Sequence, residues 1–125
     1  MIYGRLVDGR VIAPVIFRLP GQPNFSLDFV MDTGFNGYLT LPVQAVSAMN
    51  LPSYSSTPIK LADGSEALSA IHLATIVWDD VEKIVLVLAS GYKPLLGTAM
   101  MEEYHLEIDF EDNGLVSLEK ISRAA

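Results

Sequence analysis

One aspartate, Asp32, is the residue of this sequence best placed to do chemistry. It ends the apolar run 27–31, and Thr33 and Gly34 follow it directly. A strand that stops on a carboxylate and then turns through glycine presents that carboxylate at its end. Catalytic groups often lie on loops that rigid strands hold in place, and carboxylates serve as general acids and bases. The alternative interpretation is structural: a turn aspartate whose side chain accepts backbone hydrogen bonds.

The other residues with reactive or metal-binding side chains are less well placed. His72 and His105 are the only histidines, each beside apolar residues and without His-x-x-x-His spacing, so we expect neither a metal nor a catalytic role for them. The absence of cysteine excludes disulfides, thiolate catalysis and cysteine-ligated zinc. The acidic pair 79–80 is interpreted as solvated turn residues, and 111–114 lacks the spacing of a calcium loop. No metal and no cofactor are therefore expected.

The elements that must position Asp32 are short strands separated by turn residues. Asp8-Gly9 and Asp63-Gly64 each predict a hairpin tip, and Pro14 predicts an edge strand or a bulge. Strands are predicted within 1–19, 25–31, 38–41, 59–68, 69–78, 81–89, 106–110 and 115–121, and short helices over 42–49 and over 99–104 with Thr98 as cap. This pattern predicts an all-β barrel or sandwich with two short helices.

Length and composition limit the classes of function. A chain of 125 residues makes one domain, 1–125, and a hydrophobic fraction of 50% with mean hydropathy +0.35 excludes disorder. The net charge of −7 leaves no basic patch for nucleic acid. The longest apolar stretches are too short to cross a bilayer, and no signal-type segment opens the sequence. A cytoplasmic protein with no membrane or nucleic-acid partner is expected.

The order of these motifs resembles that of the retropepsin-like (retroviral-type, clan AA) aspartic proteases, especially their small soluble bacterial and cellular relatives. The resemblance rests on Asp32-Thr33-Gly34 after a hydrophobic strand and on the apolar segment 39–42 that follows. It also rests on the projecting hairpin at 59–68, and on Leu95-Leu96-Gly97 before a short helix and a closing strand pair. It covers roughly residues 27–121 and implies a retropepsin-like acid protease barrel.

The resemblance implies an aspartic endopeptidase that is a homodimer, because each chain supplies one aspartate of a catalytic dyad. One Asp32 would act as general base on a water while the protonated one donates to the peptide carbonyl. Thr33 hydroxyls would bond across the two-fold axis, and Gly34 would let the backbone run close to substrate. The flap that closes over an extended peptide or protein substrate would be formed by Ala62, Asp63, Gly64 and Ser65. Since the dyad needs one proton, activity is expected on the acid side of neutral.

Two positions depart from the family pattern. Phe35 stands where Ala or Ser is frequent, and would narrow the cleft beside the dyad. Asn36 stands where retroviral enzymes carry a substrate-binding aspartate, and its amide would make that contact without the charge. Both are candidate substrate-binding residues. Segment 115–121 is the candidate to pair across the dimer axis. Two alternatives stay open: a non-catalytic dimeric peptide-binding module with the same fold, and a monomeric β domain in which Asp32 is structural.

Overall fold

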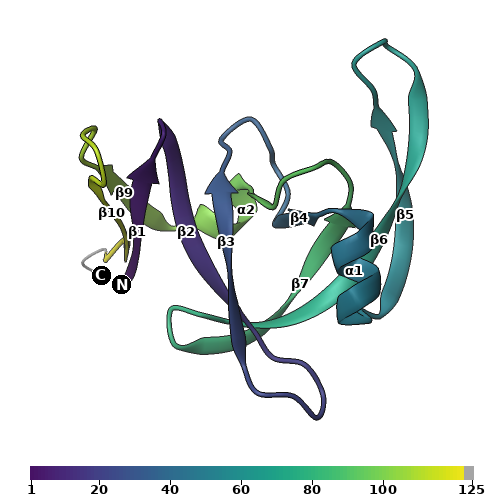
Figure 1. Ribbon diagram of the computed structural model, residues 1–125, viewed down its shortest axis with the longest axis horizontal. Coiled ribbons are helices and arrows are strands. Elements are labelled where there is room, and N and C mark those ends of the chain that lie inside the picture. Colours follow the sequence, from purple (N-terminus) through teal and green to yellow (C-terminus); the bar gives the residue numbers. More distant parts are fainter. Residues whose placement is uncertain (123–125) are drawn as a thin grey trace.

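The computed structural model describes residues 1–122, which form a curled ten-stranded sheet with two short helices (Figure 1). The strands are β1 (Ile2–Val7), β2 (Arg10–Phe17), β3 (Phe25–Met31), β4 (Leu39–Leu41), β5 (Ser53–Lys60), β6 (Glu66–Trp78), β7 (Val81–Ala89), β8 (Leu95–Leu96), β9 (Tyr104–Ile108) and β10 (Leu115–Lys120). The helices are α1 (Val43–Met49) and α2 (Thr98–Met101). The predicted all-β fold with two short helices is confirmed.

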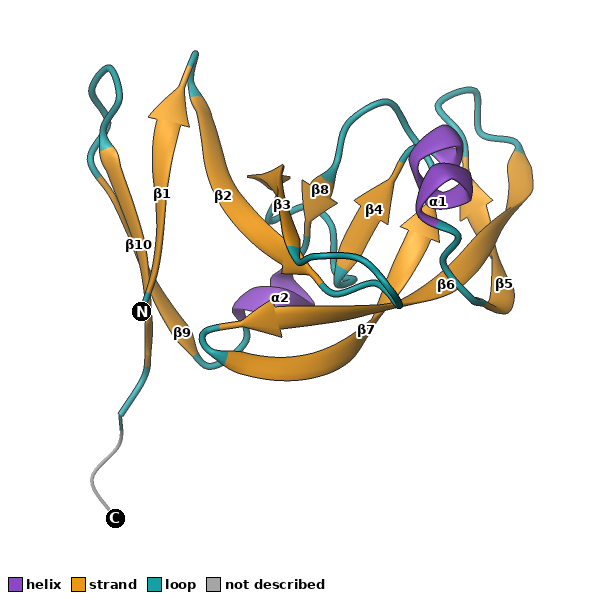
Figure 2. Ribbon diagram, turned by 60° about the horizontal axis from the view of Figure 1, so that its bottom comes forward, coloured by secondary structure: helices purple, strands orange, loops and turns teal. Residues whose placement is uncertain are grey.

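The sheet closes on itself instead of remaining flat. Its strands hydrogen-bond in the order β5-β6-β7-β4-β8-β3-β2-β1-β10-β9, and β6 pairs in addition with β2. Figure 2 shows the long strands β6 and β7 sweeping beneath the shorter strands β3, β4 and β8. The result is a small barrel-like body from which the β5–β6 hairpin projects (Figure 1).

The first hairpin forms at the predicted dipeptide. Asp8 and Gly9 both have positive φ, 50° and 75°, as a two-residue hairpin turn of this kind requires. The prediction that Pro14 marks an edge strand or bulge is wrong for the strand as a whole, because β2 lies inside the sheet. Pro14 falls between the part of β2 that pairs with β1 and the part that pairs with β6. Pro14 pairs with Asp28 of β3, but on its opposite side neither β1 nor β6 reaches it. Its missing N–H therefore costs no bond to β1 or β6.

The second hairpin is longer than predicted. β5 already begins at Ser53, and β6 runs without interruption through the two segments that the sequence analysis divided. Its tip is closed by backbone hydrogen bonds from Leu61 N to the Ser65 carbonyl at 2.8 Å and from Gly64 N to the Leu61 carbonyl at 2.9 Å. The alternation of side chains is the same in one long strand as in two consecutive short strands. The sequence pattern therefore could not show that β6 is continuous from Glu66 to Trp78.

The two helices follow the predicted positions only in part. Asn50 follows α1 with φ 56° and ends the helix at the predicted residue 49, whereas Pro42, where the helix was predicted to begin, occupies the N-cap. The second helix is a single turn whose N-cap is Gly97, so the prediction of a Thr98 cap and a helix reaching 104 is wrong. Glu103 has φ 71° and turns the chain into β9, which ends the helix early.

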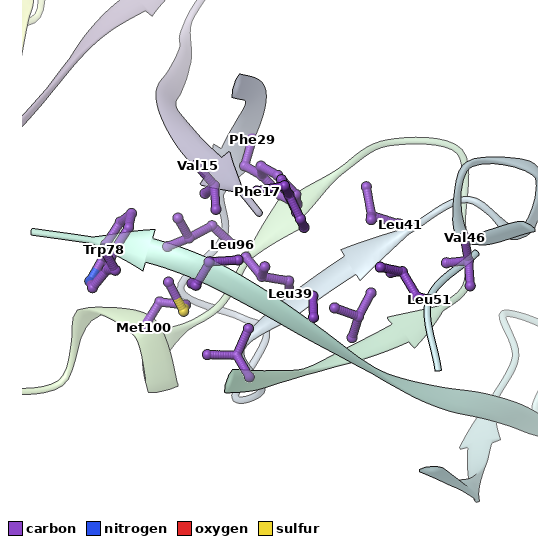
Figure 3. Close-up of a cluster of buried hydrophobic side chains, with 14 of the residues drawn as sticks. Val15, Phe17, Phe29, Leu39, Leu41, Val46, Leu51, Trp78, Leu96 and Met100 are labelled. Atoms are coloured by element: carbon purple, nitrogen blue, oxygen red, sulfur yellow. The ribbon is translucent and has the colours of Figure 1, made fainter. Parts of the chain in front are cut away.

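The core lies inside the curl of the sheet (Figure 3). The buried side chains labelled there include Phe17 and Phe29, whose rings stack with centroids 6.0 Å apart, and Leu39, Leu96 and Met100. Burying a side chain of this size contributes about 1.5–3 kcal/mol. Because these residues come from β2, β3, β4, β8 and α2, the core fixes the strands that flank Asp32.

The turn between β6 and β7 is anchored, not merely solvated. Asp79 Oδ1 accepts a hydrogen bond from the Met1 ammonium at 2.7 Å, and its Oδ2 accepts one from the Tyr104 hydroxyl at 3.0 Å. These bonds, the ammonium first, hold the pKa of Asp79 below its ordinary value. Burial, and then the bond to Asp79, raises the pKa of Tyr104 to about 12. The interpretation of Asp79 as a solvated turn residue is therefore wrong.

Replacing Tyr104 by Phe should lower the free energy of unfolding at pH 9 by roughly 1 kcal/mol, because one hydrogen bond is lost. The folded state holds the Tyr104 proton more tightly than the unfolded state does. The stabilisation by the Tyr104 hydrogen bond is therefore complete below the ordinary pKa of 10.0 and is lost as the pH rises through about 12. Urea unfolding between pH 8 and 12 measures this, with Tyr92→Phe as control because Tyr92 is 97% exposed. Equal unfolding free energies for Tyr104→Phe and wild type at pH 9 would contradict the assignment.

Candidate functional site

Asp32 directly follows β3, at the point where this strand runs parallel to β8. Its backbone N–H donates to the Leu96 carbonyl at 2.9 Å, which continues the pairing of Met31 with Leu96. The side chain is half-buried, and its Oδ1 accepts a hydrogen bond from Gly34 N at 2.8 Å. That bond is the one foreseen by the structural interpretation. It engages one of two carboxylate oxygens, so it orients the group and does not decide between the two interpretations.

The loop after Asp32 is fixed by the chain that runs from β8 into α2. Backbone N–H groups of Gly97, Thr98 and Ala99 donate to loop carbonyls at 2.9, 2.8 and 3.2 Å. The accepting carbonyls are those of Tyr38, Phe35 and Gly37, respectively. The first amides of a helix lack partners within the helix, and here the aspartate loop supplies them. Leu95-Leu96-Gly97, one of the motifs on which the resemblance rests, thus lies against the aspartate loop.

Close packing, not backbone freedom, explains the glycines of this region. Gly34 and Gly37 do not have positive φ, so a left-handed backbone conformation does not explain why these positions are glycine. A Cβ on Gly97 would lie 2.1 Å from the Gly37 carbonyl oxygen, and one on Gly37 would lie 2.5 Å from the Phe35 ring. The two segments therefore approach more closely than any side chain allows.

The predicted site residues of the loop differ in exposure. Thr33, Gly34 and Asn36 are exposed in the single chain, whereas Phe35 is half-buried. The Phe35 ring packs against Gly37 and Gly97, within 2.7 Å of the positions that their Cβ atoms would take. Phe35 therefore belongs to the packing of the loop, while its neighbours remain open to other molecules.

An apolar pocket of about 260 Å³ lies beside this loop. We call it the cleft pocket; it is lined by Phe35, Gly37, Tyr38, Leu39, Thr57, Ile71, Leu86 and Leu88. Apart from Phe35, the sequence analysis missed these residues. The sequence did contain one signal for this pocket: the run 84–89 is apolar at every position. Only Val85, Val87 and Ala89 of that run face the core, so the apolar residues between them face outward. The outward-facing leucines were available to line a pocket.

The predicted flap residues lie at the tip of the β5–β6 hairpin, and Ala62, Asp63, Gly64 and Ser65 are all exposed. Asp63 Oδ1 accepts hydrogen bonds from the hydroxyl and the backbone N–H of Ser65, which hold the pKa of Asp63 below its ordinary value. In Figure 1 the tip stands clear of the loop that follows β3. Within one chain, Phe35 and Thr57 of β5 line the same pocket. The tip of the hairpin lies apart from the loop that contains Asp32 (Figure 1).

The prediction that 115–121 pairs across a dimer axis meets a topological obstacle. β10 already pairs with β1 over residues 115–118 and with β9 over residues 116–120, so a partner strand could pair only with its last residues. The sequence pattern identified the strand but not its neighbours, because the pairing of β10 with β1 joins the two ends of the chain. At this end of the sheet the outermost strand is β9.

Neither a metal cluster nor a membrane-spanning helix is found within residues 1–122. No group of three or more histidine, aspartate or glutamate side chains gathers there in a way that would hold a metal ion. No helix of that part of the chain has the length and apolar character needed to cross a membrane.

Comparison with solved structures identifies the fold. The chain superimposes on the crystal structure of a retropepsin-like aspartic protease from Rickettsia conorii with a TM-score of 0.60, covering 98% of this chain and 92% of that one. The sequence identity is 15%. No protein-family model and no curated protein matches the sequence. The chain therefore has the retropepsin-like fold that its motifs resembled.

Proposed function

We propose that this protein is an aspartic endopeptidase whose catalytic dyad forms when two copies each contribute Asp32. The observation that carries the proposal is the position of Asp32, at the end of a core strand in a loop that three backbone bonds hold against residues 97–99. The retropepsin-like fold supports it. Because the sequence contains a single Asp-Thr-Gly, the second carboxylate must come from another copy.

The chemistry follows from bringing two carboxylates together. Both cannot remain ionised at short range, so the pair shares one proton, a behaviour for which aspartic proteases are the standard example. The ionised carboxylate removes a proton from a water, which attacks the peptide carbonyl carbon. The protonated carboxylate donates to the carbonyl oxygen, and no metal or cofactor takes part.

The exposed residues of the loop suit a contact between the two copies. Thr33 and Gly34 lie at the surface beside Asp32, where a second loop related by a two-fold axis would meet them. Thr33 would then donate across the axis to the backbone of the partner loop. With β10 enclosed by β1 and β9, the loops around Asp32 become the centre of the proposed interface.

The substrate would be an extended peptide held as an added strand by main-chain hydrogen bonds, with Asn36 among its contacts. The hairpin tip, Ala62 to Ser65, would move over it and exclude water. The cleft pocket would receive one side chain of the peptide. Its lining of Leu39, Ile71, Leu86 and Leu88 favours an apolar side chain there.

Shortening Phe35 should change cleavage specificity, because its ring forms one wall of the cleft pocket. In Phe35→Ala we expect the ratio of kcat/KM for peptides with Phe over those with Val at the pocket-facing position to rise about tenfold. A mixture of peptides analysed by mass spectrometry measures the ratio, and Phe35→Leu serves as the more conservative comparison. An unchanged ratio in a folded, active Phe35→Ala variant would contradict this role.

The function is tested by incubating an unstructured protein with the wild type from pH 3 to 8 and measuring its sedimentation in the same buffers. Cleavage that is fastest on the acid side of neutral, by a dimer, supports the endopeptidase. An inactive dimer that binds extended peptides would replace it by a peptide-binding module. A monomer in all buffers would exclude the dyad.

A further inference from the structure

A second cavity, separate from the cleft pocket, lies at the base of the β5–β6 hairpin. Its volume is about 510 Å³, and it lies between α1 and the lower part of the hairpin. Of the β6 residues, Ile71 lines the cleft pocket, whereas Leu68, Ser69, Ala70 and His72 line this cavity. We call it the α1 cavity. It shares no lining residue with the candidate active site.

The lining of the α1 cavity is uncharged and combines polar and apolar surface in about equal parts. Val46 and Leu51 form one wall at α1, and Ile59 and Leu68 form the opposite wall on the hairpin. Its polar groups are serine, asparagine and histidine side chains, without aspartate, glutamate, lysine or arginine. Small-molecule sites commonly measure 300–1,000 Å³ and combine apolar walls with a few polar groups, as this cavity does. Such a lining suits a neutral ligand and not a phosphate or a cation.

His72 gives the cavity a directional polar group. Its Nδ1 lies 3.0 Å from the carbonyl oxygen of Leu51. A carbonyl only accepts, so Nδ1 carries the proton and donates, and in the neutral ring Nε2 is left as an acceptor. The imidazole therefore favours a ligand that brings a hydrogen-bond donor.

The cavity spans the place where the hairpin leaves the body of the protein. The ladder between β6 and β7 begins at Ile71 with Leu88, whereas residues 66–70 pair only with β5. Leu68 thus belongs to the projecting part, while α1 belongs to the body. A ligand that touches both walls binds with an affinity that depends on the position of the hairpin, and it must therefore bias that position.

We propose that the α1 cavity binds a neutral, amphipathic small molecule carrying a hydrogen-bond donor, and that this ligand restrains the β5–β6 hairpin. The binding stands independently of the proposed protease function, and only its effect on catalysis rests on that function. Since the hairpin carries the proposed flap, an occupied cavity would slow its closure over Asp32.

N-phenyl-1-naphthylamine, a neutral fluorescent probe with one N–H donor, tests the binding. We expect saturable binding at one molecule per chain, weakened about tenfold or more by Ser47→Trp, which places a large ring in the cavity from α1. Gln44→Trp, on the same helix but outside the lining, should bind as the wild type does. 1-Phenylnaphthalene, which lacks the donor, should bind about tenfold more weakly.

Several outcomes would overturn the site. If the probe bound Ser47→Trp as tightly as the wild type, it would bind elsewhere. The same would hold if Gln44→Trp weakened the binding as much as Ser47→Trp does. Binding lost in Leu86→Gln but kept in Ser47→Trp would assign the probe to the cleft pocket. Equal affinity for 1-phenylnaphthalene would remove the proposed donor contact.

Hydrogen exchange of the hairpin tests the restraint without reference to activity. We expect the amides of Leu61 and Gly64, which close the tip, to exchange more slowly when the probe is bound to the wild type and to be unaffected in Ser47→Trp. Unchanged exchange in a saturated wild type would overturn the restraint. A restrained hairpin in a protein that cleaves nothing would uphold this inference while the protease proposal fails.

Discussion

For the proposed dyad, replacing Asp32 by Asn should abolish acid-favoured cleavage: we expect kcat/KM to fall by roughly three orders of magnitude or more. In a homodimer a single substitution removes both carboxylates, so neither the base that activates water nor the acid that protonates the carbonyl oxygen remains. An asparagine amide keeps the size of the side chain and still offers an oxygen to Gly34 N, now 2.8 Å from Asp32 Oδ1. The fold should therefore survive while the chemistry does not.

Asp28→Asn is the matched control for that substitution. Asp28 lies on β3, the strand that Asp32 directly follows, and its side chain is half exposed and pairs with Arg5 at 3.2 Å. Exposed pairs contribute 0–1 kcal/mol, so Asp28→Asn should retain full activity. Both variants should sediment as the wild type does. Cleavage that survives Asp32→Asn would assign the activity to another site or to a contaminant, and the proposed dyad would fall.

Gly97→Ala is expected to be the most destabilising of the small substitutions near the site. Gly97 has φ −93°, which alanine adopts without strain, so only space opposes the change. The added Cβ would lie 2.1 Å from the Gly37 carbonyl oxygen and 2.7 Å from the Phe35 carbonyl oxygen. These are backbone atoms that cannot rotate away. We expect the free energy of unfolding to fall by ~2 kcal/mol or more in urea denaturation.

A comparison with Gly37→Ala distinguishes backbone from side-chain obstruction. The atoms nearest a Cβ on Gly37 belong to the Phe35 ring, at 2.5 to 3.5 Å. Adding Phe35→Ala should therefore recover most of the stability lost in Gly37→Ala and little of that lost in Gly97→Ala. Equal recovery in both double variants would show that the ring, and not the loop backbone, limits the contact at Gly97.

The parts of the fold that short segments determine were predictable from the sequence. Asp8-Gly9 formed the expected two-residue turn, in which both φ angles are positive, and Asp63-Gly64 lies as expected at the tip of the second hairpin, within the longer loop 61–65. Asn50 ended α1 for the same local reason. Asp32 was likewise found at a strand end from the residues on either side of it. Its catalytic role stays a prediction.

The errors concern contacts between distant segments. Pro14 could be placed in a strand, but nothing near it in the sequence revealed that β1 and β6 each cover only part of β2. The need for glycine at 97 arises from a carbonyl on another segment, at Gly37. The enclosure of β10 and the lining of the cleft pocket by β5, β6 and β7 have the same origin. Such features require the pairing of strands, which alternation of residues does not specify.

The hydrogen bonds that hold the aspartate loop join opposite halves of the chain, since residues 35–38 bond to residues 97–99. During synthesis the first half leaves the ribosome with Asp32 already present but with its loop unsupported. The loop acquires its shape only when the segment around α2 has been made and has docked. The proposed catalytic group would therefore stay inert until that segment had been made and had docked.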